Sequence, residues 1–205
     1  MSKRSAQGRK PKGRVSVEKT AGDKIFEVAS DLFYSQSIRA VGVETIVKEA
    51  GVAKISLYRK FDSKDDLIVA YLENRNSGYW RIVDEIMAKY EDHPREQLRA
   101  LIAYVADRAT TQGYRGCPFI NYASEFPGRS HPGHRVVDAN KGEMRRRLMS
   151  LASAMDTRRP AQLADTLFLL IEGAYASSQT LGGRDGPARI LPSAVENLIE
   201  SHLNG

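Results

Sequence analysis

Apolar residues recur at intervals of three and four along most of the chain, which is the spacing of one face of an α-helix. No segment alternates apolar and polar residues with the period of two that marks a half-buried strand. We therefore predict an all-α fold of about nine helices. They are expected over about residues 16–36, 43–50, 54–60, 63–90, 93–111, 118–126, 134–155, 160–181 and 187–203.

Two of the predicted helices are short and closely spaced. The helix at 43–50 ends at Gly51, a residue suited to the left-handed conformation that terminates helices. After the next short helix, Ser63 is placed to cap the long fourth one, because its hydroxyl can accept a hydrogen bond from a first-turn N–H. The pair has the size of a helix-turn-helix, although many small helical proteins contain such a pair.

The second short helix has two chemically different faces. At 100° per residue, Ala53, Leu57 and Phe61 share one face, which we expect to be buried. Ile55 and Arg59 then point the opposite way. An arginine can donate two hydrogen bonds to guanine, and an isoleucine can contact a thymine methyl group. This exposed pair therefore indicates a helix that enters the major groove of DNA.

Polar residues around this pair extend the predicted DNA surface. The hydroxyls of Ser56 and Tyr58 lie on its flanks and suit phosphates or base edges, and Lys54 and Lys64 near helix N-termini can reach flanking phosphates. With Lys60, four basic residues against one acidic residue give the stretch 52–64 a net charge of +3. An ordinary solvated surface helix would leave the exposed isoleucine unexplained.

The basicity of the chain lies in its first residues. Residues 1–14 contain six basic and no acidic side chains, which equals the net charge of +6 of the whole chain. Such a stretch cannot bury enough apolar surface to fold alone, so we predict a disordered basic arm over residues 1–15. It is either a solubilising tail or an arm that enters the minor groove. The second reading assigns DNA contacts to Arg9, Lys10, Lys12 and Arg14.

The stretch from Val43 to Leu67 resembles the TetR family of bacterial transcriptional regulators. The resemblance is carried by Gly51-Val52, by Leu57-Tyr58-x-x-Phe61 and by Ser63-Lys64-x-x-Leu67, and it covers roughly residues 17–75. It implies a three-helix DNA-binding domain, an all-α ligand-binding and dimerisation domain, and two subunits on a near-palindromic operator.

By this resemblance, Tyr58 and Lys64 contact phosphates and residues 54–59 lie on the recognition helix. The sequence departs from the family at Ala53, where Ser is frequent, and at 41–43, where a Thr or Ser often begins the second helix. Thr45 is a candidate to replace the lost hydroxyl–phosphate contact. The run Gly116-Cys117-Pro118-Phe119 resembles a subgroup of the same family.

We divide the chain into the arm at 1–15, a helix-turn-helix domain at 16–66, and an effector-binding and dimerisation domain at 67–205. Aromatic residues cluster in the last of these. Aromatic residues at helical spacing are usually core, but several of them with a few polar groups also form the default ligand site. The predicted ligand-binding residues are Trp80, Tyr104, Phe119, Asn121, Tyr122, Glu125, Phe168, Glu172 and Tyr175.

The single cysteine allows several interpretations. Cys117 is either a small apolar core residue or, with Arg115 nearby, a redox-sensitive thiol. Cys117, His131 and His134 match no compact zinc pattern, so we predict no metal and no cofactor. An enzyme that uses Cys117, Glu125 and His134 has little support, and we expect no catalytic site. A lone cysteine also fits a reducing cytoplasm, where we expect the protein to work.

The last two helices carry apolar stripes, from Leu163 to Ala174 and from Leu191 to His202. Either both complete the core of one subunit, or they also pair across a two-fold axis in a four-helix bundle. A homodimer is favoured because one short recognition helix contacts few base pairs. No membrane span is expected. We predict a repressor that a small-molecule effector releases from its operator; the alternative is a regulator without an effector, which is constitutive, partner-controlled or controlled by Cys117 oxidation.

Overall fold

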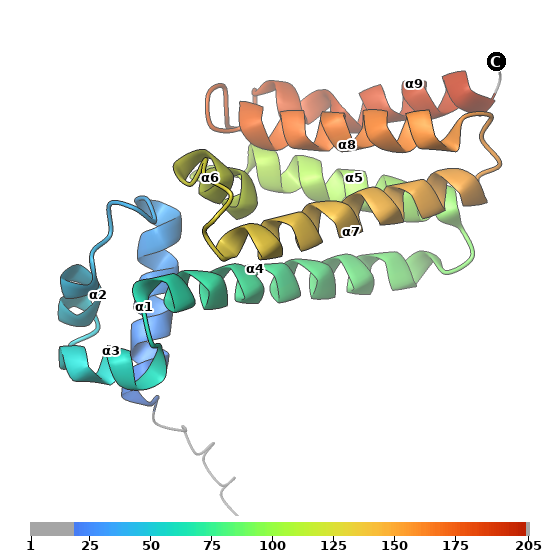
Figure 1. Ribbon diagram of the computed structural model, residues 1–205. Helices are drawn as coiled ribbons and strands as arrows, with labels where there is room; N and C mark the ends of the chain where they lie inside the picture. The colour runs from blue at the N-terminus through green and yellow to red at the C-terminus, as the bar shows by residue number, and fades with distance from the viewer. Residues whose placement is uncertain (1–18, 204–205) are drawn as a thin grey trace, which may run out of the picture.

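The computed structural model describes residues 19–203, and all regular elements in this range are helical, as predicted. Figure 1 shows a small group of helices at one end of a longer bundle. The α-helices are α1 (Ala21–Ser35), α2 (Val43–Glu49), α3 (Lys54–Lys60), α4 (Lys64–Met87), α5 (Pro94–Thr110), α6 (Pro118–Glu125), α7 (Gly133–Ala154), α8 (Pro160–Ser177) and α9 (Leu191–Leu203), and two 3₁₀ turns are η1 (Ala88–Tyr90) and η2 (Pro187–Ile190).

The first helix begins later than predicted, at Ala21 rather than near residue 16. Thr20 caps it: its Oγ1 accepts a hydrogen bond from the N–H of Asp23, and the Asp23 carboxylate accepts one from the N–H of Thr20, both at 3.2 Å. This reciprocal capping box fixes the start of a helix more firmly than the apolar period does.

Two later helices end earlier than predicted. α4 gives way to η1 after Met87, and α8 ends at Ser177 rather than near residue 181. At the end of α8, the hydroxyls of Ser177 and Ser178 donate to the carbonyls of Ala174 and Tyr175, so that side chains satisfy the last turn. The chain then turns through Gly183, whose φ of +88° favours glycine, and residues 187–190 form η2 instead of the first turn of α9.

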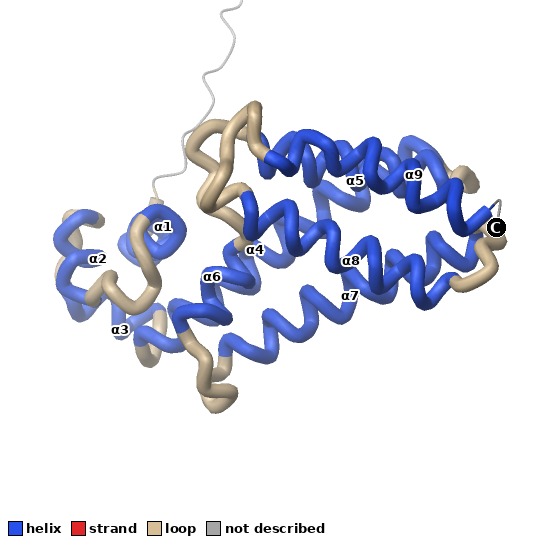
Figure 2. Tube along the Cα trace, turned by 90° about the horizontal axis from the view of Figure 1, so that it is seen from above, coloured by secondary structure: helices blue, strands red, loops and turns tan. Residues whose placement is uncertain are grey.

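The helices form two packed groups that share α4. α1 packs against α2, α3 and the start of α4 around buried residues that include Ile25, Ile46 and Leu57. The rest of α4 packs with α5 and α7, and α8 and α9 complete the bundle on the side away from α4 (Figure 1). α6 lies between the two groups, as the perpendicular view in Figure 2 also shows. The division proposed at residue 66 therefore falls inside one continuous helix.

The apolar stripes of the last two helices lie inside the subunit. Leu163, Leu167 and Ile171 on α8 and Val195 and Ile199 on α9 are all at most 2% exposed in a single chain. These residues complete the core of the monomer and cannot supply a dimer surface. In the range 19–203, no helix is both long and apolar enough to cross a membrane.

The two faces of α3 give a direct stability test. Leu57→Ala removes a side chain with no solvent exposure and should lower the free energy of unfolding by about 2–5 kcal/mol. The neighbouring Ile55→Ala alters a side chain that is 67% exposed and should change stability by less than about 0.5 kcal/mol. Urea unfolding of both variants checks the assignment; equal losses would contradict it.

Candidate functional site

α3 presents the two faces that its sequence predicts. Leu57 is fully buried, whereas Ile55 is 67% exposed and Tyr58 47% exposed, and Arg59 and Lys60 are exposed as well. Ser56 is half-buried on the flank. A large apolar side chain that is exposed beside two basic residues suits a groove lined by phosphates and thymine methyl groups.

The prediction that Ala53 is buried is wrong. Ala53 is the N-cap of α3, with extended backbone angles of φ −72° and ψ 144°, so the helical period does not apply to it. Phe61, at the other end, is half-buried and stacks on Phe26 with ring centroids 6.4 Å apart.

The turn between α2 and α3 is held by backbone hydrogen bonds. Gly51 has a φ of +64°, a left-handed conformation that favours glycine, and its N–H donates to the carbonyl of Lys48 at 3.1 Å. The N–H of Val52 donates to the carbonyl of Val47, also at 3.1 Å. This turn sets the angle at which α3 projects from the domain.

The lysines predicted to reach phosphates already have partners. Lys54 forms an exposed ion pair with Glu44 at 2.5 Å, and its hydrogen bond to that carboxylate raises the lysine pKa. Lys64 is half-buried, and its Nζ donates to the carbonyl of Ile38 at 2.8 Å; burial lowers its pKa. Thr45 is exposed on α2. The arm residues Arg9, Lys10, Lys12 and Arg14 lie outside the described residues.

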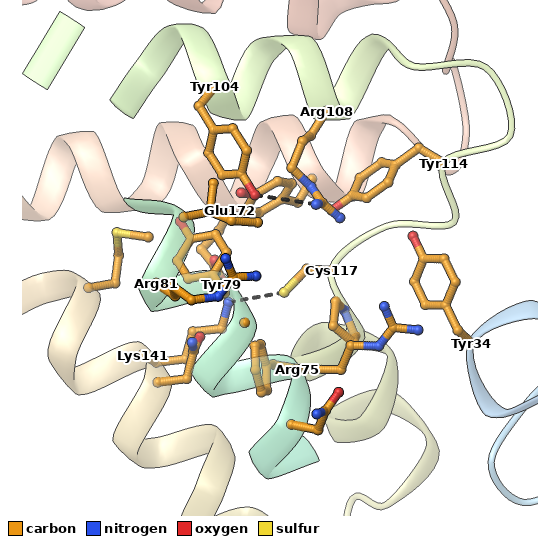
Figure 3. Close-up of a pocket in the computed structure, with 18 residues that line it drawn as sticks. Tyr34, Arg75, Tyr79, Arg81, Tyr104, Arg108, Tyr114, Cys117, Lys141 and Glu172 are labelled. Carbon is orange, nitrogen blue, oxygen red and sulfur yellow. Dashed lines mark hydrogen bonds and ion pairs between the residues drawn. The ribbon is translucent and has the colours of Figure 1, made fainter. Parts of the chain in front are cut away.

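A cavity of about 190 Å³ lies in the larger helical group, and we call it the inner cavity. Figure 3 shows side chains from α1, α4, α5, α7 and the loop before α6 converging on it. The residues that line it include Tyr34, Arg75, Tyr79, Arg81, Tyr104, Arg108, Tyr114, Cys117, Phe119, Lys141, Glu172 and Tyr175.

Four of the nine predicted ligand residues line the inner cavity: Tyr104, Phe119, Glu172 and Tyr175. The other five do not, because helical spacing does not say which side of a many-sided core an aromatic ring faces. The five are Trp80, Asn121, Tyr122, Glu125 and Phe168.

Three of these five belong to the packing of the helices. Trp80 stacks beneath the guanidinium of Arg147 at 4.4 Å. Tyr122 is fully buried, and its hydroxyl is 2.7 Å from Nδ1 of His131. Phe168 packs against the edge of the core.

Glu125 and Asn121 instead connect α6 to neighbouring loops. Oε2 of Glu125 accepts hydrogen bonds from Oγ of Ser37 and from the N–H of Arg39, both at 2.8 Å. Asn121 donates to the carbonyl of Arg115 at 2.9 Å and accepts from Nε2 of Gln179 at 3.0 Å. Glu125 thus ties the α1–α2 loop to the end of α6.

Tyr34 makes a second tie between the same regions. Its hydroxyl accepts from the N–H of Arg115 at 3.1 Å and donates to the carbonyl of Gly116 at 3.3 Å. We call the bonded set of Tyr34, Ser37 and Arg39 with Arg115, Gly116 and Glu125 the α1 junction. Since Tyr34 also lines the inner cavity, the junction places a residue of the helix-turn-helix group at the cavity wall.

Sequence reasoning missed the basic residues of the inner cavity. Arg75, Arg108 and Lys141 all line it. Each follows a buried residue by three or four positions (Tyr71, Val105 and Val137), so each continues an inward-facing row of its helix. A charged residue within an otherwise buried row was the available signal.

The polar groups of the inner cavity are mostly hydrogen-bond donors. Burial raises the pKa values of Tyr79, Tyr114 and Tyr175, which keeps their hydroxyls neutral. Lys141 forms an ion pair with Glu172 at 2.7 Å, and its Nζ is also 3.5 Å from Sγ of the buried Cys117. Among residues 19–203, no three His, Cys, Asp or Glu side chains are grouped as metal ligands.

An exposed recognition helix on a small helical domain, joined to a helical bundle with a cavity, defines a helix-turn-helix regulator with a companion domain. Comparison with known proteins agrees. Residues 25–71 match the bacterial regulatory proteins of the tetR family, and residues 94–193 match the tetracyclin repressor-like C-terminal domain. Together these matches cover well over half of the chain, and the chain belongs to the TetR family of helix-turn-helix transcriptional regulators.

Individual relatives support this assignment. An uncharacterized HTH-type transcriptional regulator of Mycobacterium tuberculosis is 36% identical over 80 residues, which is 38% of each of the two chains. The uncharacterized regulator YxaF of Bacillus subtilis is 28% identical over 77% of this chain and 84% of its own. The crystal structure of a TetR-family regulator from Streptomyces coelicolor has a TM-score of 0.79 at 28% identity, covering 90% of this chain and 88% of that one.

The α1 junction can be tested by removing one oxygen atom. Tyr34→Phe deletes the hydroxyl that bonds the loop at 115–116 and should destabilise the fold by about 0.5–1.5 kcal/mol. Tyr90→Phe, at an exposed tyrosine in η1, should have no measurable effect. Equal unfolding midpoints in urea for Tyr34→Phe and the unmodified protein would show that these hydrogen bonds contribute nothing.

Proposed function

We propose that this protein is a sequence-specific repressor that leaves its operator when a small molecule fills the inner cavity. The observation that carries the proposal is the position of Tyr34. This residue belongs to α1, the central helix of the helix-turn-helix group, and also forms part of the cavity wall. A ligand in the cavity therefore contacts the DNA-binding group directly.

In this proposal, α3 reads the major groove. Arg59 donates to a guanine and Ile55 contacts a thymine methyl group, while Ser56, Tyr58 and Lys60 face the backbone of the duplex. Thr45, Lys54 and Lys64 add phosphate contacts. For the two lysines this requires operator phosphates to displace their present partners, the carboxylate of Glu44 and the carbonyl of Ile38. Arg9, Lys10, Lys12 and Arg14 enter the neighbouring minor groove.

Release follows from the geometry of two linked helix-turn-helix groups. Half-sites one helical turn apart require the two recognition helices to lie about 34 Å apart. A ligand that displaces Tyr34 or the 115–118 segment shifts the α1 junction, and with it α1 and α3. Even a small rotation of α1 at the cavity moves α3, so that the two recognition helices no longer fit successive major grooves.

Members of the TetR family dimerise, and we place the dimer surface on the outer face of α8 with α9. Leu169 on α8 is 69% exposed in the single chain, and Gly173 and Ala176 continue the same exposed row. Small residues in such a row allow a second helix to approach closely, and an exposed leucine is the apolar anchor that an interface needs.

One observation favours a second mode of regulation, by oxidation of Cys117. Cys117 lines the inner cavity with the ammonium of Lys141 3.5 Å from its sulfur. Small oxidants that enter the inner cavity can reach this sulfur and oxidise it reversibly, so the same cavity can sense an oxidant in place of a ligand. A regulator that is constitutive or controlled by a partner protein would need neither the cavity nor the thiol.

Selection from a random DNA library with the purified full chain tests the proposed function. We expect a near-palindromic sequence to be enriched, with half-sites one helical turn apart. Binding that does not distinguish the selected sequence from random DNA at moderate salt would overturn the proposal.

Arg59 separates specificity from general affinity. Arg59→Ala should weaken binding to the selected operator by about 1–3 kcal/mol and relax the preference at one base pair in each half-site. Lys89→Ala, which removes a lysine in η1 at the far end of α4, should change neither. Quantitative gel-shift titrations on operators altered one base pair at a time measure both effects. A uniform loss across all sequences would assign Arg59 to the phosphate backbone.

Leu169 tests the placement of the dimer surface. Leu169→Glu buries a carboxylate in the proposed interface and should convert the dimer to monomers at micromolar concentration. Tyr90→Glu, an exposed position outside α8 and α9, should leave the dimer intact. Sedimentation velocity distinguishes the two states, and a dimeric Leu169→Glu protein would place the interface elsewhere.

A further inference from the structure

The inner cavity holds more positive than negative charge. Arg75, Arg81, Arg108 and Lys141 line it, whereas Glu172 is the one acidic residue of the described chain that does so. Lys141 and Glu172 neutralise each other at 2.7 Å, and Arg81 pairs with Glu85 at 3.1 Å. The guanidinium groups of Arg75 and Arg108 have no ion pair with any carboxylate of residues 19–203.

These two guanidinium groups are held by aromatic rings instead. Arg75 lies over the rings of Tyr34 and Tyr71, with distances of 4.9 and 5.4 Å to their centroids. Ring faces attract a cation without neutralising its charge. The charge of Arg75 therefore remains available to an anion in the cavity.

The guanidinium of Arg108 is likewise held by two tyrosine rings. It lies over the rings of Tyr104 and Tyr114, at 5.7 and 5.2 Å, and Nη1 donates one hydrogen bond of 3.3 Å to the Tyr104 hydroxyl. Because a guanidinium carries five N–H donors in a planar fork, most of the donors of Arg108 remain for a ligand.

The remaining polar groups also favour an acceptor. The Tyr79 hydroxyl is buried, and although Tyr175 lies close to it, no group of residues 19–203 makes a hydrogen bond with it. Tyr114 and Tyr175 stay protonated, because burial raises their pKa values. A buried hydroxyl without a partner is costly, and a ligand oxygen would remove that cost.

The size of the inner cavity limits the ligand. Its volume is about 190 Å³. A cavity of about 150 Å³ in another protein accommodates benzene, so this one has room for a single ring with a short substituent. The tyrosine and phenylalanine side chains around it offer the edges and faces on which such a ring packs.

We propose that the effector is a single-ring aromatic acid whose carboxylate is bound by Arg108 and Arg75 and whose ring lies among the cavity tyrosines. Planar carboxylates match the two-pronged geometry of guanidinium groups, and the buried Tyr79 hydroxyl donates to a further oxygen of the ligand. A neutral aromatic compound would leave both arginines without a counter-charge, and an amine would be repelled. This inference specifies the ligand of the proposed function.

Matched pairs of probes test the charge requirement on the unmodified full chain. Benzoate and 4-hydroxyphenylacetate are compared with benzamide and 4-hydroxyphenylacetamide, which keep the ring and lose the charge. Isothermal calorimetry should show that at least one acid binds about tenfold or more tightly than its amide. Equal affinities within both pairs, or an absence of binding by both acids, would overturn the inference.

Arg108→Gln locates the bound charge. The variant should lose about tenfold or more in affinity for the acid while its affinity for the amide stays unchanged. Arg145→Gln is the matched control, because Arg145 pairs with Asp165 on the surface and does not line the cavity. An Arg108→Gln protein that binds the acid as tightly as the Arg145→Gln control would place the carboxylate elsewhere and contradict the assignment.

Operator binding in the same samples separates this inference from the proposed function. If an acid binds through Arg108 and the operator stays bound, the ligand class is correct and ligand-driven release is wrong. If neither acid binds but an amide displaces the operator, release is correct and the aromatic acid is wrong.

Discussion

The C-terminal end of α1 is bonded to both helical groups, the helix-turn-helix group and the larger bundle, and the arrangement of the molecule depends on this constraint. One side of α1 packs against α2 and α3, so it fixes the helix-turn-helix. Its last turn holds Tyr34, whose hydroxyl bonds the loop before α6, and the following loop is held by Glu125. Because α4 also runs unbroken from one group into the other, α3 has little freedom to move without a change at the α1 junction.

The chemistry of the inner cavity is consistent with this mechanical link. Two guanidinium groups are held in place by tyrosine rings, and within residues 19–203 no carboxylate forms an ion pair with either of them. One of these rings belongs to Tyr34. In the proposed mechanism, a ligand that draws Arg75 toward its own negative charge weakens the contact between α4 and α1. The proposed recognition of a charged ligand and the proposed movement of the DNA-binding group thus involve the same two side chains, Arg75 and Tyr34.

The sequence was sufficient to predict the features that local periodicity controls. Ile55 and Leu57 could be assigned to opposite faces, because a seven-residue helix with a single buried side has only one orientation that fits its pattern. The predicted start of α1 near residue 16 was wrong, because the apolar period does not mark where a helix begins, and the capping box of Thr20 and Asp23 starts it at Ala21. The stripes of α8 and α9 were identified correctly, but their burial within one subunit depends on how the bundle closes.

The inner cavity was harder to predict. Tyr104 and Tyr175 could be assigned to it, but Trp80 and Tyr122 have the same character and face other parts of the core. Which rings share a cavity depends on the packing angles of helices that are far apart in sequence. Glu125 was predicted as a ligand contact because it is a polar residue close to clustered aromatic residues. Its partner, the backbone N–H of Arg39, lies 86 positions away, and no local pattern could indicate it.

We propose that ligand binding in the inner cavity and operator binding by α3 are coupled. Coupling of this kind is reciprocal: a ligand that weakens operator binding by some factor must itself bind more weakly to the operator complex by the same factor. The direct measurement is the affinity of the best-binding aromatic probe for the free protein and for the protein saturated with its operator. We predict weaker binding to the complex, by the factor that the probe imposes on the operator. Equal affinities for the two forms would contradict the account.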